Sequence, residues 1–306
     1  MTVKAYLELV RAPAALTVLG DTLVGAASAG RALGVRGLAL PLASACLYAS
    51  GMALNDYADR ELDAVERPER PIPSGRISPR RALGVAVGLT AAGLAIAAAA
   101  GGRRSFAVAL PLTASIWLYD LVAKPTAAGP AVMAACRGLD VLMGAGSDRI
   151  GAAAPSAAIM ASHTFGVTAL ARGEVHGTTP AIARAVALGT AANTIAALSI
   201  PLPAGSVSGS PGGLRAPSPA AGATRTLAAA SALSYAAACG PAQLETVETP
   251  DAAHARRATG RGIRAMVPLQ TALAARAGSL GATLVLAAVD VAGRLLSRRR
   301  STADIT

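Results

Sequence analysis

The sequence predicts an all-α membrane protein, a polytopic bundle of about nine transmembrane helices. Of its 306 residues, 53% are hydrophobic, and the mean hydropathy is +0.48. Only 15% are charged, whereas a soluble domain carries roughly 25%. Apolar windows also recur along nearly the whole chain, each close to the ~20 residues that cross a bilayer as a helix.

The predicted spans follow these windows in chain order. They are 13–30, 38–54, 82–101, 105–122, 131–146, 154–171, 181–202, 222–240 and 279–297. A further window, 263–275, is interrupted by Arg264, Gln270 and Arg276, which indicates either an interfacial helix or a short span. The count is therefore nine or ten, and the side of the arginine-rich C-terminal run stays open.

We expect the spans to form a single domain over 1–306. The segment 203–221 is rich in Gly, Ser and Pro, so it predicts a flexible external loop, and 301–306 reads as a polar tail. The first window predicts a retained span rather than a cleaved signal peptide.

Loop charge predicts orientation and partners. The loop 55–81 carries six arginines, which indicates the cytoplasmic side of the inner cell membrane. The loops 123–130, 172–180 and 241–257 then fall on that side too. The net charge of +11 sits in loops, with no basic domain and no aromatic-interleaved patch. The lipid bilayer is thus an expected partner and nucleic acid is not.

A run of acids closes the second predicted span. Asp56, Asp59 and Asp63 are spaced i, i+3, i+7, so on one helix their carboxylates share a stripe and repel one another. Such a stripe favours a bound cation, and oxygen-only ligands favour Mg²⁺ or Ca²⁺.

The loop after the acids is rich in arginine and proline. Arg67, Arg70 and Arg76 offer planar forks suited to phosphate oxygens. The alternative is a salt-bridged surface built from the i,i+4 pairs Asp56–Arg60 and Asp63–Arg67, which leaves Asn55 and Asp59 without a role.

Two further polar clusters lie at or inside later spans. Tyr119, Asp120 and Lys124 close the fourth span as candidate functional residues, although Lys124 alone is also explained by snorkelling to the interface. Arg137 lies inside the fifth span and requires a partner. Asp140 at i+3 is the simplest one, and an anionic substrate in a polar cavity is the alternative.

A fourth cluster, Arg172, Glu174 and His176, closes the sixth span. Glu174 is a second candidate metal ligand. Arg172 and His176 are suited to binding phosphate, or one of the two is suited to transferring a proton. The alternative for His176 is a solvated loop histidine without a catalytic role.

Together these clusters resemble the UbiA family of intramembrane prenyltransferases over essentially the whole chain. The matching motifs are Asn55-Asp56-x-x-Asp59-x-x-x-Asp63, Arg67-Pro68-x-Arg70-Pro71-Ile72-Pro73-Ser74-Gly75, and Tyr119-Asp120 with Lys124. The resemblance implies about nine spans around a cavity open to the cytoplasmic face and to lipid. It also implies Mg²⁺-dependent transfer of a prenyl group from an allylic polyprenyl diphosphate to a lipophilic or aromatic acceptor.

The resemblance also implies residue roles. The expected metal ligands are Asn55, Asp56, Asp59, Asp63 and Glu174. The expected catalytic residues are Asp56, Asp59, Asp63, Lys124 and Glu174. The expected diphosphate-binding residues are Asn55, Arg67, Arg70, Tyr119, Asp120, Arg137, Arg172 and His176.

The sequence departs from the family at two points. The second aspartate-rich motif keeps only Glu174, and position 140, where the family leads us to expect asparagine, is Asp140. The form Arg172-Gly173-Glu174-Val175-His176-Gly177 is similar to a divergent, EboC-like branch. An alternative function follows: a degenerate member that binds or transports an isoprenoid or lipid metabolite without catalysis.

Overall fold

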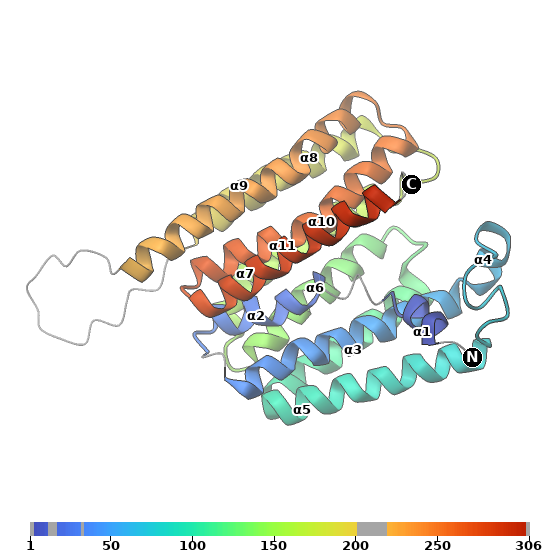
Figure 1. The fold of residues 1–306 in the computed structure, drawn as a ribbon, viewed down its shortest axis with the longest axis horizontal. Coiled ribbons are helices and arrows are strands. Elements are labelled where there is room, and N and C mark those ends of the chain that lie inside the picture. Colours follow the sequence, from blue (N-terminus) through green and yellow to red (C-terminus); the bar gives the residue numbers. More distant parts are fainter. Residues whose placement is uncertain (1–2, 12–16, 32–33, 201–218, 304–306) are drawn as a thin grey trace, which may run out of the picture. The chain divides into compact units, whose positions relative to one another are not determined.

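The computed structural model describes residues 3–11, 17–31, 34–200 and 219–303. Within these ranges the chain is helical and has no strand, which confirms the predicted all-α class. The chain divides into two compact units, Met1–Thr168 and Ala169–Thr306, and each is described by itself (Figure 1). The predicted loop 203–221 lies almost entirely outside the described residues.

Each predicted window overlaps a helix, while residues 13–16 of the first window and 201–202 of the seventh lie outside the described residues. The first unit holds α1 (Val3–Leu9), α2 (Leu19–Ser28), α3 (Val35–Ala58), α4 (Arg60–Glu66), α5 (Pro79–Leu118), the π-helix η2 (Tyr119–Ala123), α6 (Gly129–Ala145) and nearly all of α7 (Ile150–Ala171). The second unit holds α8 (Pro180–Ser199), α9 (Pro219–Glu248), α10 (Ala252–Arg276) and α11 (Leu280–Ala303). The expected polar tail therefore begins inside α11, whose last residue is Ala303.

Helix α5 contains two of the predicted spans joined by a sharp reversal. Gly102 has φ 63° and ψ −161°, a conformation that glycine adopts without strain. Beyond it, Trp117 Nε1 donates a hydrogen bond to Thr90 Oγ1 at 3.2 Å. In a straight helix these two residues would lie about 40 Å apart. The chain therefore doubles back at Gly102, as the separate windows 82–101 and 105–122 predicted.

The weak window 263–275 lies within α10, which at about 1.5 Å per residue is long enough to cross a bilayer. Its residues from Ala265 to Ala275 are all buried, so this half of α10 forms the core of the second unit rather than an interfacial surface.

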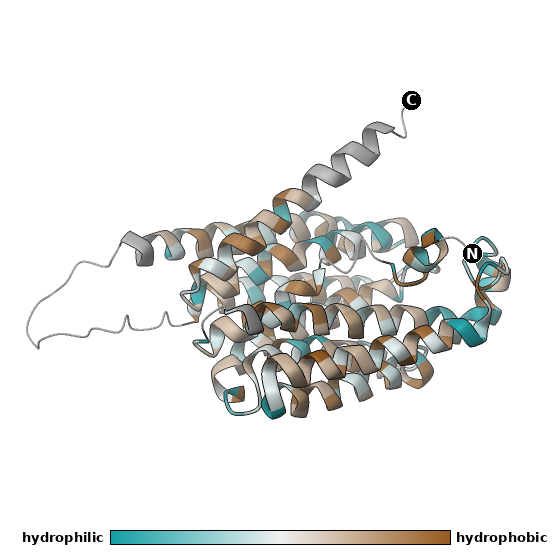
Figure 2. Cartoon of the chain, turned by 60° about the horizontal axis from the view of Figure 1, so that its bottom comes forward, coloured by the Kyte–Doolittle hydropathy of each residue, from teal (hydrophilic) through white to brown (hydrophobic). Residues whose placement is uncertain are grey.

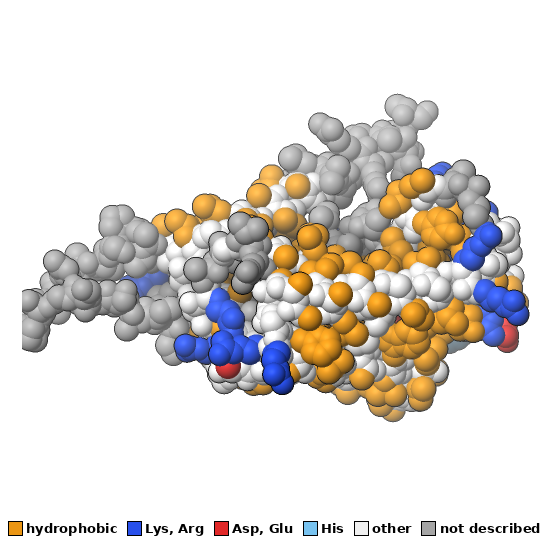
Figure 3. All heavy atoms as spheres, turned by 90° about the horizontal axis from the view of Figure 1, so that it is seen from below, with side chains coloured by type: hydrophobic (Ala, Val, Ile, Leu, Met, Phe, Trp, Pro, Cys, Tyr) orange, Lys and Arg blue, Asp and Glu red, His pale blue; other side chains and the backbone are white. Residues whose placement is uncertain are grey.

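Hydrophobic residues run along the helices, and hydrophilic residues gather toward the helix ends and loops (Figure 2). By length and composition, three helical stretches among the described residues are suited to crossing a membrane: Leu38–Ala58, Pro79–Ala123 and Pro180–Ser199. The second of them includes the α5 hairpin. The face in Figure 3 carries hydrophobic side chains over its middle, with Lys and Arg side chains at both ends.

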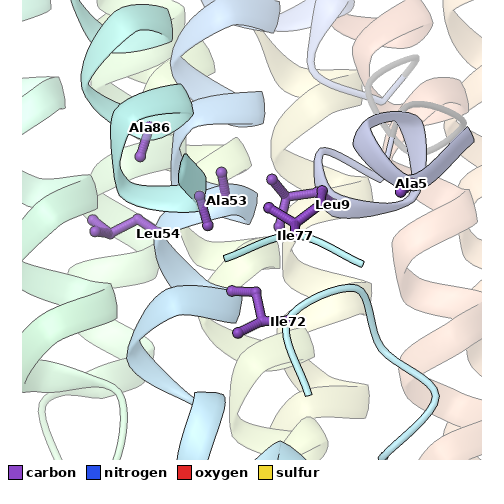
Figure 4. Packing of buried hydrophobic residues seen from close by; sticks show 8 residues of the cluster. Ala5, Leu9, Ala53, Leu54, Ile72, Ile77 and Ala86 are labelled. Atoms are coloured by element: carbon purple, nitrogen blue, oxygen red, sulfur yellow. The ribbon is translucent and has the colours of Figure 1, made fainter. Parts of the chain in front are cut away.

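A hydrophobic cluster fixes the proline-rich loop that follows α4. Ile72 and Ile77 from this loop lie in one buried cluster with Leu54 of α3 and Leu9 of α1 (Figure 4). Arg76 adds two hydrogen bonds outside the cluster. Arg76 Nη1 donates to Glu8 Oε2 at 2.5 Å, and Arg76 Nη2 donates to the Glu69 carbonyl at 2.6 Å. The loop is thereby docked on the bundle, and this positions Arg70.

Helices α2 and α6 cross at near backbone contact. A Cβ atom on Gly144 would lie 2.0 Å from the Thr22 carbonyl oxygen, and one on Gly25 would lie 1.8 Å from the Val141 carbonyl oxygen. Only glycine fits at either position, as expected where small residues allow helices to approach closely in a membrane.

We expect Gly144→Ala to destabilise the first unit by about 1–3 kcal/mol, because the added methyl group must push two helix backbones apart. The measurement is the thermal unfolding midpoint of the purified protein in detergent. Gly151→Ala is the matched control, because a Cβ there meets no atom within 4 Å. An unchanged midpoint for Gly144→Ala would show that this crossing is looser than the structure indicates.

Candidate active site

The predicted acid stripe lies at the end of α3 and continues into α4. Asn55 and Asp56 are buried in the last turn of α3, and Asp63 is buried in α4. Asp59 stands at the junction, where α3 ends and α4 begins, so the stripe is not one unbroken helix. The backbone N–H groups of Asp59 and Asp63 still donate to the carbonyls of Asn55 and Asp59, at 2.9 and 2.8 Å. The acids therefore follow one another with nearly helical spacing.

Two of these carboxylates converge on one guanidinium group. Arg70 Nη1 donates to Asp63 Oδ2 at 2.6 Å and to Asp56 Oδ1 at 3.3 Å. Arg11 Nη2 donates to the same Asp56 oxygen at 3.1 Å. The Asp56 and Asp63 side chains are only 5% and 3% exposed. Buried carboxylates this close together require compensating charge, and here two arginines supply it.

The alternative i,i+4 salt bridges do not form. Arg60 instead pairs with Glu61 at 3.2 Å and lies over the Tyr57 ring, 4.9 Å from its centroid. Arg67, expected to bind diphosphate, is exposed and has no ion pair within the described part of the chain. The acids thus bond to distant arginines, not to their helix neighbours.

Helix η2 and the lysine after it are joined to the end of α3 by one ion pair and one side-chain hydrogen bond. Lys124 pairs with Asp59, and Asn55 Nδ2 donates to Asp120 Oδ1 at 3.2 Å. The backbone N–H of Lys124 bonds to the Tyr119 carbonyl at 2.9 Å, the i→i−5 pattern of a π-helix. Single π-turns often occur at functional sites, and this one brings both side chains to α3. The predicted element Tyr119-Asp120 with Lys124 therefore lies beside the acids.

Asn55, Asp56, Asp59 and Asp63, with the hydrogen-bonded Asp120, are here named the acid cluster. They suit a hard divalent cation, because every candidate ligand among them is an amide or carboxylate oxygen. Oxygens of Asp56 and Asp63 lie within 3.3 Å of the same Arg70 nitrogen, so the two carboxylates already converge on one positively charged group. Within the described residues, no three His, Cys, Asp or Glu side chains stand together in a metal-binding arrangement. In this conformation the arginines and Lys124, rather than a metal-ready cage, organise the acids.

A pocket of about 110 Å³ opens beside the cluster. Its lining comes from α3, α5, η2 and α6, with one residue next to α2. The lining residues are Val18, Ser44, Leu47, Tyr48, Gly51, Met52, Leu112, Ile116, Tyr119, Asp120, Met133, Cys136, Arg137 and Asp140. Asp120 belongs both to this lining and to the acid cluster, so the apolar pocket and the charged cluster are continuous within the first unit.

The partner predicted for Arg137 is corrected by the structure. Arg137 Nη1 donates to Asp21 Oδ2 of α2 at 2.5 Å, and Asp21 is completely buried. Asp140 instead accepts a hydrogen bond from Ser44 Oγ at 2.5 Å. The reason is geometric, because α2 crosses α6 so closely that its acid reaches the guanidinium of the buried arginine.

The fourth polar cluster belongs to the second unit. Arg172, Glu174 and His176 lie in the turn after α7, where the Glu174 carbonyl accepts a hydrogen bond from Arg256. Arg172 and His176 are exposed and Glu174 is half-buried. The structure therefore gives this cluster its own local geometry and does not test its expected role toward the acids of the first unit.

Sequence reasoning missed two residues of the first unit, Arg11 and Asp21. Arg11 is the only described non-glycine residue with a positive φ, 46°, a strained conformation that often occurs at functional sites. Asp21 is an acid inside the first apolar window, and an intramembrane acid is itself a functional signal.

The UbiA prenyltransferase family model matches residues 16–175, which is more than half of the chain. The chain belongs to the UbiA prenyltransferase family. This confirms the resemblance drawn from the motifs. Together with the apolar helices, it identifies an integral membrane protein.

Curated relatives match over part of their length. Digeranylgeranylglyceryl phosphate synthase of Methanopyrus kandleri is 43% identical over 124 residues, which cover 40% of this chain and 45% of that protein. The enzyme of the same name from Ignicoccus hospitalis is 46% identical over 99 residues, 32% of each chain. The matched region thus spans less than half the length of these relatives.

Solved structures of UbiA homologues share the fold. A structure of digeranylgeranylglyceryl phosphate synthase in membranes matches 91% of this chain and 99% of its own, with a TM-score of 0.61 and 16% identity. An Archaeoglobus fulgidus UbiA homologue, solved with DMAPP and Mg²⁺, matches 85% of this chain and 98% of its own, with a TM-score of 0.55 and 18% identity. At these identities the likeness establishes the fold alone.

Proposed function

We propose that this protein transfers a prenyl group from an allylic polyprenyl diphosphate to a lipophilic or aromatic acceptor within the membrane, in a Mg²⁺-dependent reaction. The observation that carries the proposal is the continuity of the acid cluster with the apolar pocket through Asp120. A diphosphate requires the charged cluster, and a prenyl chain requires the apolar pocket.

In this proposal the oxygens of Asn55, Asp56, Asp59 and Asp63 hold Mg²⁺, which supplies charge to stabilise the departing diphosphate. Arg70 and Lys124 lie among these acids, so a diphosphate bound there meets fixed cations from two elements. Negative charge grows on the leaving group as the allylic carbon–oxygen bond breaks, and preorganised cations favour that change. The apolar pocket keeps water away from the allylic cation.

Arg11 joins this set although the sequence did not single it out. Its guanidinium shares Asp56 Oδ1 with Arg70, so it belongs to the same charge network. Within the first unit, Arg67 is then the weakest of the proposed diphosphate ligands, because its side chain is exposed and has no ion pair among the described residues.

The names of the curated relatives suggest the acceptor class. Several are digeranylgeranylglyceryl phosphate synthases, which supports a prenylated glyceryl phosphate as the first acceptor to test. We further propose that the protein lies in the inner cell membrane with this site on the cytoplasmic side. The loop 55–81, which begins at the acids, carries six arginines, and loops rich in arginine stay in the cytoplasm.

The direct test is diphosphate release from dimethylallyl, geranyl, farnesyl and geranylgeranyl diphosphates by the purified protein, with and without Mg²⁺. We expect Mg²⁺-dependent release that an acceptor accelerates. If every donor binds but none is cleaved under any acceptor condition, the protein is instead a binding or transport member of the family.

We expect Glu174→Gln to impair Mg²⁺-dependent diphosphate release less than Asp59→Ala, because Glu174 is the only acid left in the second motif. The comparison uses initial rates of both variants at saturating Mg²⁺. Glu245→Gln, in the same unit but outside the motif, serves as the control. An equal loss of the diphosphate-release rate in Glu174→Gln and Asp59→Ala would show that Glu174 is as important for catalysis as the first motif.

A further inference from the structure

Within the second unit, helix α10 covers the same depth of the membrane as α8. At one end, Arg256 Nη1 donates a hydrogen bond at 2.5 Å to the carbonyl of Glu174, in the loop before α8. At the other end, Arg276 Nη2 donates to the carbonyl of Ile200, the residue directly after α8. Helix α8 is one of the stretches suited to crossing a membrane. The part of α10 between these two arginines therefore lies at the depth of a span, and it covers about 30 Å, the thickness of a hydrocarbon core.

Three arginines form one exposed stripe, here named the arginine stripe, along the first half of α10. Arg257, Arg261 and Arg264 are spaced i, i+4, i+7, so they share a face of the helix, and all three are exposed. The opposite face, which includes Gly262, is buried. From Ala265 to Ala275 every residue of α10 is buried. The exposed positive charge therefore begins in the first turns of the helix and stops near its middle.

No acidic side chain neutralises the arginine stripe. The guanidinium groups of Arg257, Arg261 and Arg264 have no ion pair or hydrogen bond within the described part of the chain. The nearest acid in the sequence, Asp251, bonds to His254 instead, at 2.8 Å. Like charges at these helical spacings repel one another, and more strongly where the dielectric constant is low. The stripe is therefore suited to an anionic ligand.

The deep end of the stripe lies inside the membrane. Arg264 follows Arg256 by eight residues, which places it about 12 Å farther along the helix axis. An arginine exposed to hydrocarbon at this depth is costly, and intramembrane arginines normally face a polar partner or water. The adjacent Ile263 is 42% exposed, so an apolar side chain lies next to the charges. This surface matches an amphiphile with an anionic head and an apolar chain.

We propose that Arg257, Arg261 and Arg264 bind the phosphate monoester head of a membrane lipid. The lipid chain then lies in the bilayer beside Ile263. A phosphate monoester carries a charge of about −1.5 to −2 at neutral pH, and arginine presents a planar fork to phosphate oxygens. A phosphodiester head has one negative charge, so it matches three guanidinium groups less well. A lipid is favoured over soluble phosphate because its chain contributes apolar contact at this depth.

This lipid binding requires neither Mg²⁺ nor prenyl transfer, so it does not depend on the proposed function. The prenylated glyceryl phosphate suggested above as an acceptor carries the same kind of head. The arginine stripe is then a lipid-binding site of the second unit, separate from the acid cluster of the first.

The test titrates the purified protein, in micelles of a neutral detergent, with three probes. Dioleoyl phosphatidic acid is a phosphate monoester, dioleoyl phosphatidylglycerol is a phosphodiester with the same chains, and glycerol 3-phosphate is the monoester head alone. Affinities come from the rise of the unfolding midpoint with probe concentration, in the presence of EDTA so that no divalent ion bridges lipid and protein.

We expect wild-type protein to bind phosphatidic acid at least about tenfold more tightly than either other probe, because only this lipid combines the doubly charged head with a chain. Equal affinity for phosphatidic acid and phosphatidylglycerol would overturn the assignment of a monoester. Equal affinity for phosphatidic acid and glycerol 3-phosphate would overturn the assignment of a lipid.

Arg264→Gln should weaken phosphatidic acid binding about tenfold, because it removes the deepest guanidinium group. Arg184→Gln is the matched control, since Arg184 is an exposed arginine of α8 in the same unit and its loss changes the net charge equally. An equal loss of affinity in the two variants would show attraction to overall charge and overturn the site. Arg261→Gln, on the same stripe, decides in the same way if Arg264→Gln does not fold.

Failure of this inference is distinguishable from failure of the proposed function. A protein that prefers phosphatidic acid through Arg264 but releases no diphosphate would uphold the lipid site and reject prenyl transfer. A protein that releases diphosphate and binds the three probes equally would uphold prenyl transfer and reject the lipid site.

Discussion

Asp59→Ala is expected to reduce Mg²⁺-dependent diphosphate release by at least about a hundredfold, the scale of losing one charged group that stabilises a transition state. Asp59 stands at the junction of α3 and α4 and pairs with Lys124. The substitution therefore removes a proposed metal ligand and also frees the lysine. Initial rates of diphosphate release measure the effect.

Glu66→Gln is the matched control for Asp59→Ala, because Glu66 is an exposed acid on the neighbouring helix α4. Asp59→Asn adds a finer comparison, since it keeps the size and one oxygen. Activity near wild type in Asp59→Ala, with Glu66→Gln also active, would remove Asp59 from the metal site.

Arg70→Met is expected to lower the free energy of unfolding by about 3–5 kcal/mol, the cost of leaving a buried charge without its partner. Arg70 is shared by Asp56 and Asp63, whose side chains are almost fully buried. The loss should be partly recovered by Mg²⁺, because a divalent ion held by the same oxygens would replace the missing positive charge. Unfolding midpoints with and without Mg²⁺ provide the measurement.

Arg67→Met should change neither the midpoint nor its response to Mg²⁺, since Arg67 is exposed. The Arg70 account fails if the Arg70→Met midpoint matches wild type. It fails equally if Mg²⁺ stabilises Arg70→Met no more than it stabilises Arg67→Met.

Local sequence pattern predicted much of the first unit. The acid spacing placed Asp56, Asp59 and Asp63 at the end of a helix, and the apolar windows on either side of Gly102 predicted the two halves of α5. These features depend on neighbours in the chain and on composition, which a single sequence displays directly. The element Tyr119-Asp120 with Lys124 was recognised as a motif.

Long-range pairing was not predictable in the same way. Local spacing suggested Asp140 for Arg137, but Asp21 is its hydrogen-bonding partner because glycines let α2 and α6 cross at backbone contact. Arg11 reaches Asp56 from the segment after α1 for a similar tertiary reason. The π-turn at η2, which sets the register of Lys124 against Asp59, also has no simple sequence signature.

Mn²⁺ binding, followed by electron paramagnetic resonance, tests the central claim most directly, because Mn²⁺ is a spectroscopic substitute for Mg²⁺ at oxygen ligands. The protein is titrated with Mn²⁺ in the presence of a non-cleavable thiolo analogue of geranyl diphosphate. We predict bound Mn²⁺ in the wild type and in Glu66→Gln, and its loss in Asp59→Ala and Asp63→Ala. Equal Mn²⁺ binding by all four proteins would show that the acids at the end of α3 do not hold the metal and diphosphate.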